Sequence, residues 1–271
     1  MLKVESFDQI QQFIKQIRAL HEGFVTNFYW DPNKHPYWLA EETLYYEQSP
    51  HCVLLIHPNT NFANLYYIAT DYSAVNTTLN AIQTNSDIVV DIVCKGDGLL
   101  EKESFCEMGF ELYKNLYRMN HIGPIVQPDW QKEDSVINGS KKDAQLVYQA
   151  LKDDFDPLCE QLPTLQEVED YAQRQQLLVV KDEGRICGFL IAELNGVTWY
   201  LRYWYTSPQY RDQGIGAKLL RNSLIDGKNS KRQIFWVIAD NENAIKRYER
   251  YGFRKENMND FVMIKRKQQE Q

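Results

Sequence analysis

The stretch SPQYRDQGIGAKLLRNSL, Ser207 to Leu224, places an arginine and two glycines ahead of a run of helix-forming residues. It follows VTWYLRYWYT, whose aromatic and β-branched residues predict a strand. A strand that leads through glycines into a helix suits an anion, because the first helical amides lack intrahelical partners and the helix dipole is positive there. Arg211 can add a charge-assisted contact. The stretch therefore indicates a phosphate-binding loop.

Two common kinds of phosphate loop do not fit these letters. The P-loop ends in GK[ST], which is missing here. The dinucleotide fingerprint needs Gly or Ala where Leu219 stands, and it follows the first strand of a βαβ unit. For Gly-x-Gly alone, a plain surface turn is the simpler interpretation. The arginine three positions before Gly214 and the flanking strand and helix favour the phosphate.

Hydrophobic periodicity predicts the elements on either side of this loop. In the second half we expect a hairpin over 177–194, a strand over 198–206, a helix from about 214, a strand over 233–240, a helix over 241–251 capped by Asn241, and two final antiparallel strands over 252–258 and 260–266. In the first half we expect a helix over 6–20, strands over 51–58, 64–70 and 87–94, and helices over 72–83 and 99–108. Strands and helices mix without strict alternation, which indicates an α+β fold with a mixed α/β sheet. A Pro- and Gly-containing connection predicts a domain boundary near residue 130.

A faint internal repeat links the two halves. Residues 87–119 and 233–264 both read as strand, helix, Gly-Phe, strand. Phe105 stands four residues before Gly109, and Tyr248 stands four residues before Gly252. The pattern favours a duplicated domain, although chance similarity is the alternative.

Charge is unevenly distributed along the chain. The net charge is -7 overall, with 8 basic and 16 acidic residues in 1–130 but 15 basic and 8 acidic residues from 196 onward. An acidic chain is a poor general binder of nucleic acid, whereas a basic final third suits one anionic ligand, or is simply solvated surface. No apolar run approaches the roughly 20 residues that cross a bilayer, so no membrane partner is expected. The five cysteines are scattered without CxxC spacing, which predicts no metal site and a cytoplasmic location.

Two motifs together resemble one family. RDQGIG, with Pro208 ahead of it, resembles the R/Q-x-x-G-x-G/A loop of the GNAT superfamily of N-acetyltransferases, which holds the pyrophosphate of coenzyme A. NENAIKRYERYGF resembles that family's N-x-x-A-x-x-x-Y-x-x-x-G-F helix, and the likeness spans roughly 133–271. The resemblance implies a GNAT-like acyl-CoA N-acyltransferase fold in two tandem copies. The expected catalytic domain is 131–271, and 1–130 is expected to be a degenerate copy without the CoA loop.

The resemblance also implies roles for particular residues. The expected cofactor-binding residues are Trp204, Tyr205, Thr206, Arg211, Asp212, Gln213, Gly214, Ile215, Gly216, Ala217 and Asn241. Tyr248 would protonate the leaving thiolate, unless it is only a core aromatic. Glu193 is the candidate general base, with a water relay or an ordinary surface glutamate as alternatives. Arg202 would bind a substrate carboxylate, unless it forms an ordinary salt bridge.

The expected function is acetyl-CoA-dependent transfer of an acetyl group to a primary amine of a small molecule or amino-acid-like acceptor, by a monomer or homodimer. Phe105 has no hydroxyl, so the first half would not catalyse, although it could close the acceptor cleft or mimic a dimer partner. One alternative is a module that senses an acyl-CoA without turnover. Another alternative is a tandem aminoacyl transferase that uses charged tRNA. The acidic first half and the CoA loop both argue against this alternative.

Overall fold

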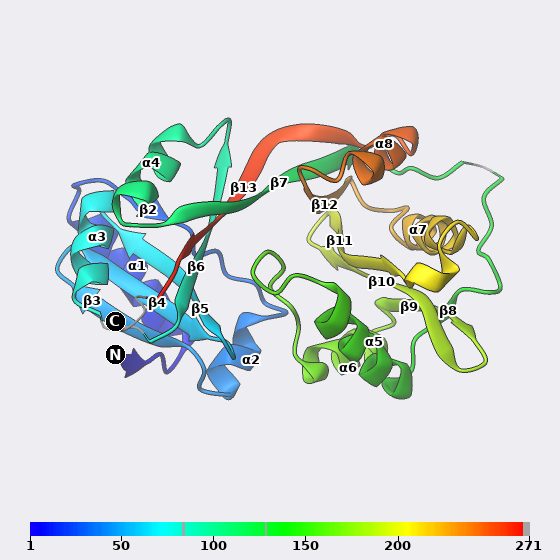
Figure 1. Cartoon of the computed structure of the whole chain (residues 1–271), viewed down its shortest axis with the longest axis horizontal. Helices are drawn as coiled ribbons and strands as arrows, with labels where there is room; N and C mark the ends of the chain where they lie inside the picture. Colours follow the sequence, from blue (N-terminus) through cyan, green and yellow to red (C-terminus); the bar gives the residue numbers. More distant parts are fainter. Residues whose placement is uncertain (83–84, 128, 268–271) are drawn as a thin grey trace. The chain divides into compact units, whose positions relative to one another are not determined.

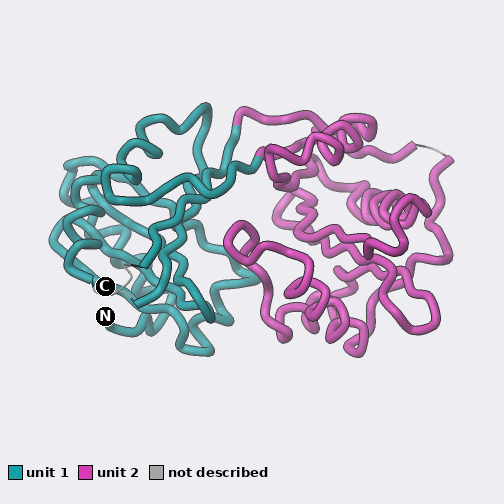
Figure 2. The backbone as a smooth tube through the Cα atoms, in the orientation of Figure 1, with its two compact units in different colours: residues 1–116, 258–271 teal, residues 117–257 magenta. Residues whose placement is uncertain are grey.

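The computed structural model describes residues 1–82, 85–127 and 129–267. They form two compact units, unit 1 (Met1–Leu116 with Met258–Gln271) and unit 2 (Tyr117–Asn257), which Figure 2 colours separately. The chain passes from one unit to the other within two long strands, β7 (Glu111–Ile122) and β13 (Arg254–Lys265). The change of unit therefore falls at residue 116 and again at 258, and not in the connection near residue 130 to which the sequence pointed.

Unit 1 is a mixed sheet with helices on both faces (Figure 1). Its strands lie in the order β1-β3-β4-β5-β6-β13, and β2 pairs separately with β5. The strands are β1 (Leu2–Lys3), β2 (Val25–Thr26), β3 (Tyr45–Ser49), β4 (Cys52–Pro58), β5 (Phe62–Ala69) and β6 (Asp87–Lys95). The helices are α1 (Phe7–Ala19), α2 (His35–Ala40), α3 (Tyr72–Asn80) and α4 (Leu99–Glu107). Two cores result, because alternate residues of β4 and β5 pack against α1 and α2 on one face and α3 and α4 on the other.

Unit 2 repeats this plan. Its strands lie in the order β7-β12-β11-β10-β9-β8. The remaining strands are β8 (Ile137–Asn138), β9 (Leu177–Asp182), β10 (Arg185–Asn195), β11 (Thr198–Thr206) and β12 (Arg232–Ile238). The helices are α5 (Lys141–Asp154), α6 (Leu165–Gln173), the short 3₁₀ turn η1 (Pro208–Tyr210), α7 (Ile215–Asp226) and α8 (Glu242–Arg250). Leu177 and Val179 of β9 pack with α5 and α6, while Leu178 and Val180 pack with α7, so the sheet separates two cores.

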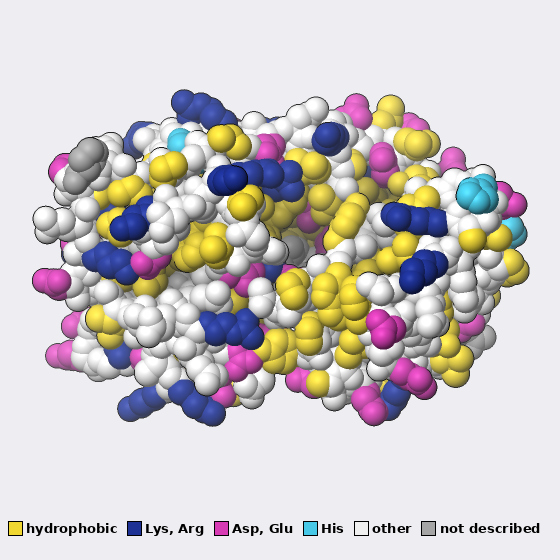
Figure 3. All heavy atoms as spheres, turned by 180° about the vertical axis from the view of Figure 1, so that it is seen from behind, with side chains coloured by type: hydrophobic (Ala, Val, Ile, Leu, Met, Phe, Trp, Pro, Cys, Tyr) yellow, Lys and Arg dark blue, Asp and Glu magenta, His cyan; other side chains and the backbone are white. Residues whose placement is uncertain are grey.

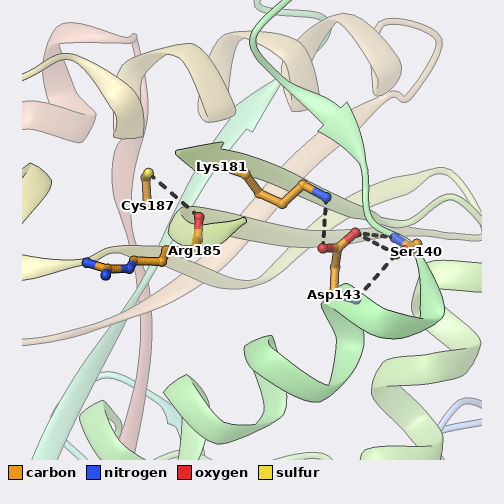
Figure 4. A network of polar contacts seen from close by, with 5 residues as sticks. All are labelled: Ser140, Asp143, Lys181, Arg185 and Cys187. Atoms are coloured by element: carbon orange, nitrogen blue, oxygen red, sulfur yellow. Dashed lines mark hydrogen bonds and ion pairs between the residues drawn. The ribbon is translucent and has the colours of Figure 1, made fainter. Parts of the chain in front are cut away.

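A polar contact fixes α5 on this sheet. The Asp143 carboxylate accepts hydrogen bonds from the backbone and hydroxyl of Ser140 and pairs with Lys181 of β9 at 2.9 Å (Figure 4). Burial alone would raise the pKa of Asp143, but these hydrogen bonds and the ion pair bring that pKa below its usual value. Asp143 therefore completes the capping box that Ser140 begins at α5 and ties the first turn of α5 to β9 at the same time.

Most of the predicted elements are confirmed. The hairpin, the 198–206 strand and the helix that follows Gly214 have the predicted bounds to within a few residues. The helix expected over 72–83 ends at Asn80, and residue 83 lies outside the described residues. None of the helices in the described part of the chain is long and apolar enough to cross a membrane.

The prediction of two final antiparallel strands is wrong. β13 is one strand of 12 residues, because Arg254–Lys265 contains no glycine or proline that could turn the chain. Its last eight residues pair antiparallel with β6, and the Asn259 side chain donates to the carbonyl of Gly96. The segment between the two expected strands is thus held extended by β6.

The faint repeat corresponds to matching local structure in both units. α4 and α8 each end in a Gly-Phe turn whose glycine has a left-handed backbone, with φ of 86° and 93°. In each turn the phenylalanine donates its backbone N–H to the helix, to the carbonyl of Phe105 at 3.0 Å or of Tyr248 at 3.3 Å. Phe105 and Tyr248 therefore occupy equivalent positions in the two units.

Candidate functional site

Strand β11 separates from β12 soon after the two begin to pair. Only Thr198–Tyr200 pair with β12, through Arg232–Ile234, whereas β10 stays paired with β11 as far as Thr206. In the part of the chain that the structure describes, the β12-facing edge of β11 therefore has no strand partner beyond Tyr200. Backbone donors and acceptors on an unpaired edge can bind an extended ligand as a further strand would.

A β-bulge lies at the start of this free edge. Ile191 pairs with Tyr203 and Ala192 pairs with Leu201, so Arg202 is an extra residue on β11. A bulge bends the strand and changes the direction of its backbone groups. Trp204, Tyr205 and Thr206, which were predicted to pair with a cofactor arm, follow directly after the bulge.

The Gly-rich loop leads from β11 into α7 as predicted. Gly214 is the N-cap of α7 with φ of 77°, and it provides no side chain to cap the helix. Lys218 donates the first helical hydrogen bond, to the carbonyl of Gly214 at 3.0 Å, so the amides of Ile215, Gly216 and Ala217 precede the helical ladder. Arg211 is exposed and makes no ion pair with any described residue. The loop thus combines uncommitted amides with an uncommitted cation.

Gly216 brings this helix end close to the end of β11. A Cβ added at Gly216 would lie 3.1 Å from the Thr206 hydroxyl oxygen and 3.4 Å from the Trp204 indole nitrogen. A larger residue would push the helix away from the strand. Asp212 and Gln213 complete the loop, and Asp212 has a left-handed φ of 64°.

Helix α8 presents Asn241 and Tyr248. Asn241 caps the helix, because its side-chain oxygen accepts from the amide of Ala244 at 3.2 Å. Its side-chain amide remains available as a donor. The Tyr248 ring lies 5.3 Å from Trp204 and 4.5 Å from Phe235, which places it between the two diverging strands β11 and β12. Tyr248 is therefore at the point where β11 becomes free.

The Tyr248 hydroxyl is a proton donor at neutral pH. Burial, with a contribution from the negative charge of Glu160, raises the pKa of Tyr248 to about 12, while Arg247 partly opposes the shift. Within the described residues no hydrogen bond occupies this hydroxyl, although the ring is only half-buried. The group is protonated and free to donate.

Glu193 and Arg202 occupy each other. The Glu193 side chain is fully buried on β10 and forms an ion pair with the guanidinium of Arg202, which also stacks on the Tyr200 ring at 4.4 Å. The sequence suggested a surface position as the alternative for Glu193, and the structure instead buries it. A base role for Glu193, or substrate binding by Arg202, would require this buried pair to break, at a considerable cost.

No pattern in the sequence points to Glu160, a carboxylate with the properties of a base. It lies in the loop between α5 and α6, whose backbone turns so that Cys159 and Glu160 both donate to the carbonyl of Asp156. The hydroxyl of Tyr203, on β11 beside the bulge, donates to the neighbouring Gln161 carbonyl at 2.8 Å. This contact holds the loop against the strand that carries the site.

Burial, assisted by the charge of Asp156, raises the pKa of Glu160 to about 7. The charge of Glu160 in turn raises the pKa values of Tyr203 and Tyr248. In the described residues its carboxylate forms no ion pair or hydrogen bond. No local motif marks Glu160, because its loop approaches β11 only through the tertiary fold.

The predicted residues thus divide into two groups. The end of β11, the loop, the start of α7 and Tyr248 converge at the separation of β11 from β12, whereas Glu193 and Arg202 are bound to each other in a buried ion pair. Nowhere in the described residues do three or more His, Cys, Asp or Glu side chains gather as metal ligands would.

Comparison with known proteins bears on the family likeness and on the fold. Residues 144–253 match the model of the Acetyltransferase (GNAT) family. No curated protein matches the chain by sequence. A tandem GNAT protein from the clavulanic acid biosynthesis pathway is similar over 100% of this chain and 99% of its own, with a TM-score of 0.60 and 11% identity.

Two further solved structures have the same fold. An acetyltransferase from the GNAT family of Colwellia psychrerythraea covers 98% of both chains, with a TM-score of 0.55 and 12% identity. A GCN5-related N-acetyltransferase from Sphaerobacter thermophilus covers 81% of this chain and 82% of its own, also with a TM-score of 0.55 and 12% identity. Residues 144–253, within the second unit, are therefore similar to the acetyltransferase (GNAT) family, and over its full length the chain has the fold of a tandem GNAT protein.

Proposed function

We propose that unit 2 transfers an acetyl group from acetyl-CoA to a primary amine of a small molecule or amino-acid-like acceptor. One observation carries the proposal: the free edge of β11, the uncapped N-terminus of α7 and the unbonded Tyr248 hydroxyl meet at the same place. The site offers an extended edge for pantetheine, amides for a pyrophosphate, and an acid beside the thioester.

The residues fit this ligand in particular ways. The amides of Ile215, Gly216 and Ala217 would bind pyrophosphate oxygens, with Arg211 as a charged partner. The backbone after the bulge at Arg202 would bind the pantetheine arm and polarise the carbonyl oxygen. Bound acetyl-CoA supplies an activated acyl group on a good leaving group, and the chain itself supplies orientation and proton transfer.

Glu160 and Tyr248 are the proposed proton-transfer pair. The amine loses a proton as its new N–C bond forms, and the sulfur gains one as the C–S bond breaks. Glu160, with a pKa of about 7, can accept the first, directly or through water. Tyr248, with a pKa of about 12, can donate the second. Their pKa values are pushed apart in the order that these two roles require.

Charge around the site favours an amine over a nucleic acid. Asp156 and Glu160 lie on the loop beside β11, where they would attract a cationic amine. On the face of the molecule in Figure 3, basic side chains are interspersed with acidic ones and do not form a continuous basic patch. A tRNA substrate would need such a patch. A cytoplasmic location, suggested by cysteines that are all free, is part of this proposal.

The test combines binding with turnover. Acetyl-CoA should raise the melting temperature in a saturable manner, because it binds only the folded state. Thiol release should then exceed the hydrolytic background with at least one member of a panel of amino acids, polyamines, aminoglycosides and peptides. Saturable binding without thiol release across the panel would support the sensing module instead. No thermal shift at millimolar acetyl-CoA would contradict both interpretations.

The pH dependence of kcat/KM should show the ionisation of Glu160. Because a base must be unprotonated, kcat/KM should rise with pH through about 7 and level off above it. Glu160→Gln should remove this rise and lower kcat/KM on the plateau by about a hundredfold. Asp156→Asn keeps the oxygen that accepts from Leu158 but removes the nearby charge, so the rise should move to lower pH.

A stability measurement distinguishes the loss of a catalytic base in Glu160→Gln from misfolding of that variant. The pKa of Glu160 is raised in the folded state, so its contribution to stability is present at acid pH and is lost as pH increases through about 7. Glu160→Gln should therefore have a higher melting temperature than the parent chain at pH 8, despite its lower activity. An unchanged pH profile in this variant would remove Glu160 from the proposed role.

A further inference from the structure

Unit 1 contains a second pair of separating strands. β5 pairs with β6 only through Phe62–Asn64 and Asp87–Val89, whereas β4 stays paired with β5 to its end at Ala69. This is the arrangement of β11 and β12 in unit 2, where the free edge is open. In unit 1 the corresponding edge of β5 is occupied by another strand.

The chain itself fills the free edge of β5. β2 pairs antiparallel there, with Val25 opposite Ala69 and Thr26 opposite Ile68. Gly23 allows the approach, because a Cβ at this residue would lie 2.7 Å from the carbonyl oxygen of Thr70. A segment of unit 1 thus takes the place that an extended ligand would need.

Asn27 then links the two separated strands. Its amide donates to the carbonyl of Leu65 on β5 and to the carbonyl of Asp91 on β6, both at 3.1 Å. Its side-chain oxygen accepts from the amide of Tyr67 at 2.7 Å. All three contacts use backbone groups that would otherwise be unpaired, so the segment is firmly held.

The start of α3 also differs from the start of α7. Asp71 caps α3, and its carboxylate accepts from the amide of Ala74 at 2.8 Å. A carboxylate repels a phosphate at the position where Gly214 of unit 2 leaves the helix end open. Unit 1 is thus unsuited to an acyl-CoA on two separate grounds.

The filled gap still contains a cavity of about 390 Å³. Sites for small molecules in proteins have volumes of about 300–1,000 Å³. The cavity residues that matter here are Arg18, Tyr29, Tyr67, Tyr72, Cys94 and Glu101. Their side chains combine aromatic rings with one cation and one carboxylate.

Neither of these two charges is neutralised by the chain. Glu101 makes no ion pair or hydrogen bond with a described residue. Burial raises the pKa values of Tyr67, Tyr72 and Cys94, and the charge of Glu101 raises them further. Arg18 stacks on the ring of Phe24 at 4.4 Å and has no carboxylate partner among the described residues. Arg18 of α1 and Glu101 of α4 thus bring two opposite charges to the lining of one cavity, each without a partner among the described residues, and they point to a ligand that carries both complements.

We propose that this cavity binds a small zwitterion of amino-acid size, with its ammonium group at Glu101 and its carboxylate at Arg18. The hydrogen-bonded hydroxyls of Tyr67 and Tyr72 and the ring of Tyr29 give it an aromatic wall that suits an ammonium group. The guanidinium of Arg18 can bind a carboxylate through two parallel hydrogen bonds. This site is separate from the acetyl-transfer site and does not depend on the function proposed for unit 2.

Cys94 makes the cavity directly observable. It lines the cavity, whereas Cys106 is exposed on the same helix that carries Glu101. Alkylation by iodoacetamide, followed by mass spectrometry of the two peptides, can be run with each of the twenty common amino acids at millimolar concentration and without acetyl-CoA. Mildly alkaline pH is needed, because burial and Glu101 raise the pKa of the Cys94 thiol. At least one amino acid should slow modification of Cys94 severalfold and leave Cys106 unchanged.

Matched variants assign the effect to the two charges. Glu101→Gln and Arg18→Gln should each abolish the protection of Cys94. Glu103→Gln on α4 and Lys15→Gln on α1, both exposed, should retain it. The amide and the N-acetyl derivative of the protecting amino acid should protect poorly, because each lacks one charge.

Three results would overturn the proposal: no amino acid protects Cys94, protection survives both charge variants, or the uncharged derivatives protect equally well. Equal melting temperatures of the unliganded variants and parent would show that the fold is intact. The same assay in Tyr248→Phe keeps the outcome independent of acetyl transfer.

Discussion

Tyr248→Phe is expected to lower kcat for acetyl transfer by about a hundredfold or more and to leave acetyl-CoA affinity within about twofold. The ring packs against Trp204 and Phe235, and phenylalanine retains those contacts. Only the hydroxyl is lost, and among the described residues it has no hydrogen-bond partner. Its loss therefore removes a proton donor without leaving a buried group unsatisfied. Steady-state kinetics and calorimetric titration with acetyl-CoA give the two quantities.

Tyr251→Phe is the matched control. Tyr251 follows α8 directly and packs against the same core, so its loss of a hydroxyl should leave kcat nearly unchanged. Because burial raises the pKa of Tyr248 to about 12, the parent chain should show no fall in kcat from this group over pH 7 to 9. Equal turnover in Tyr248→Phe and the parent would exclude Tyr248 as the acid.

Gly214→Val is expected to weaken acetyl-CoA binding by at least about tenfold. Gly214 has φ of 77°, and a β-branched residue in this left-handed region costs about 1–2 kcal/mol, which a change of backbone would relieve. Such a change would redirect the amides of Ile215 and Gly216 away from the pyrophosphate. Titration of acetyl-CoA and of free coenzyme A should show the same loss, because the defect lies at the shared phosphate site.

Gly184→Val tests whether strain alone explains that result. Gly184 lies in the β9–β10 turn with φ of 82°, and a Cβ there, as at Gly214, would meet no atom within 4 Å. The two substitutions therefore introduce similar local strain in the same unit, but only one lies in the loop. Both should lower the melting temperature, and only Gly214→Val should lower the affinity. A similar loss of affinity in both variants would contradict the assignment of the loop.

Local signals were enough to predict the elements of unit 2. The glycines, the capping Asn241 and the alternation in β10 and β11 each act over a few residues, so their pattern is visible in the letters. The Gly-Phe turns after α4 and α8 were visible for the same reason, and they carry the repeat that both units share.

Strand pairing between residues far apart in the sequence could not be predicted from such local patterns. β13 continues through a polar segment because β6 supplies its partners, and β6 is more than 150 residues earlier in the sequence. Short β2 has no periodicity of its own, and it forms because the free edge of β5 needs partners. The strand propensity of a short stretch of residues does not depend on these distant partners, so it predicts neither strand.

The sequence by itself determined the strand, loop and helix that carry RDQGIG, and their resemblance to the GNAT family, because these depend on neighbouring residues. Only the tertiary structure decided which carboxylate is free. Glu193 is bound to Arg202 in a buried pair, whereas Glu160 comes to the site on a loop held by Tyr203. Only the tertiary structure, too, showed that one separated strand pair is open and the other is filled. A charge acquires its pKa from its surroundings, and distant segments create those surroundings only when the chain folds.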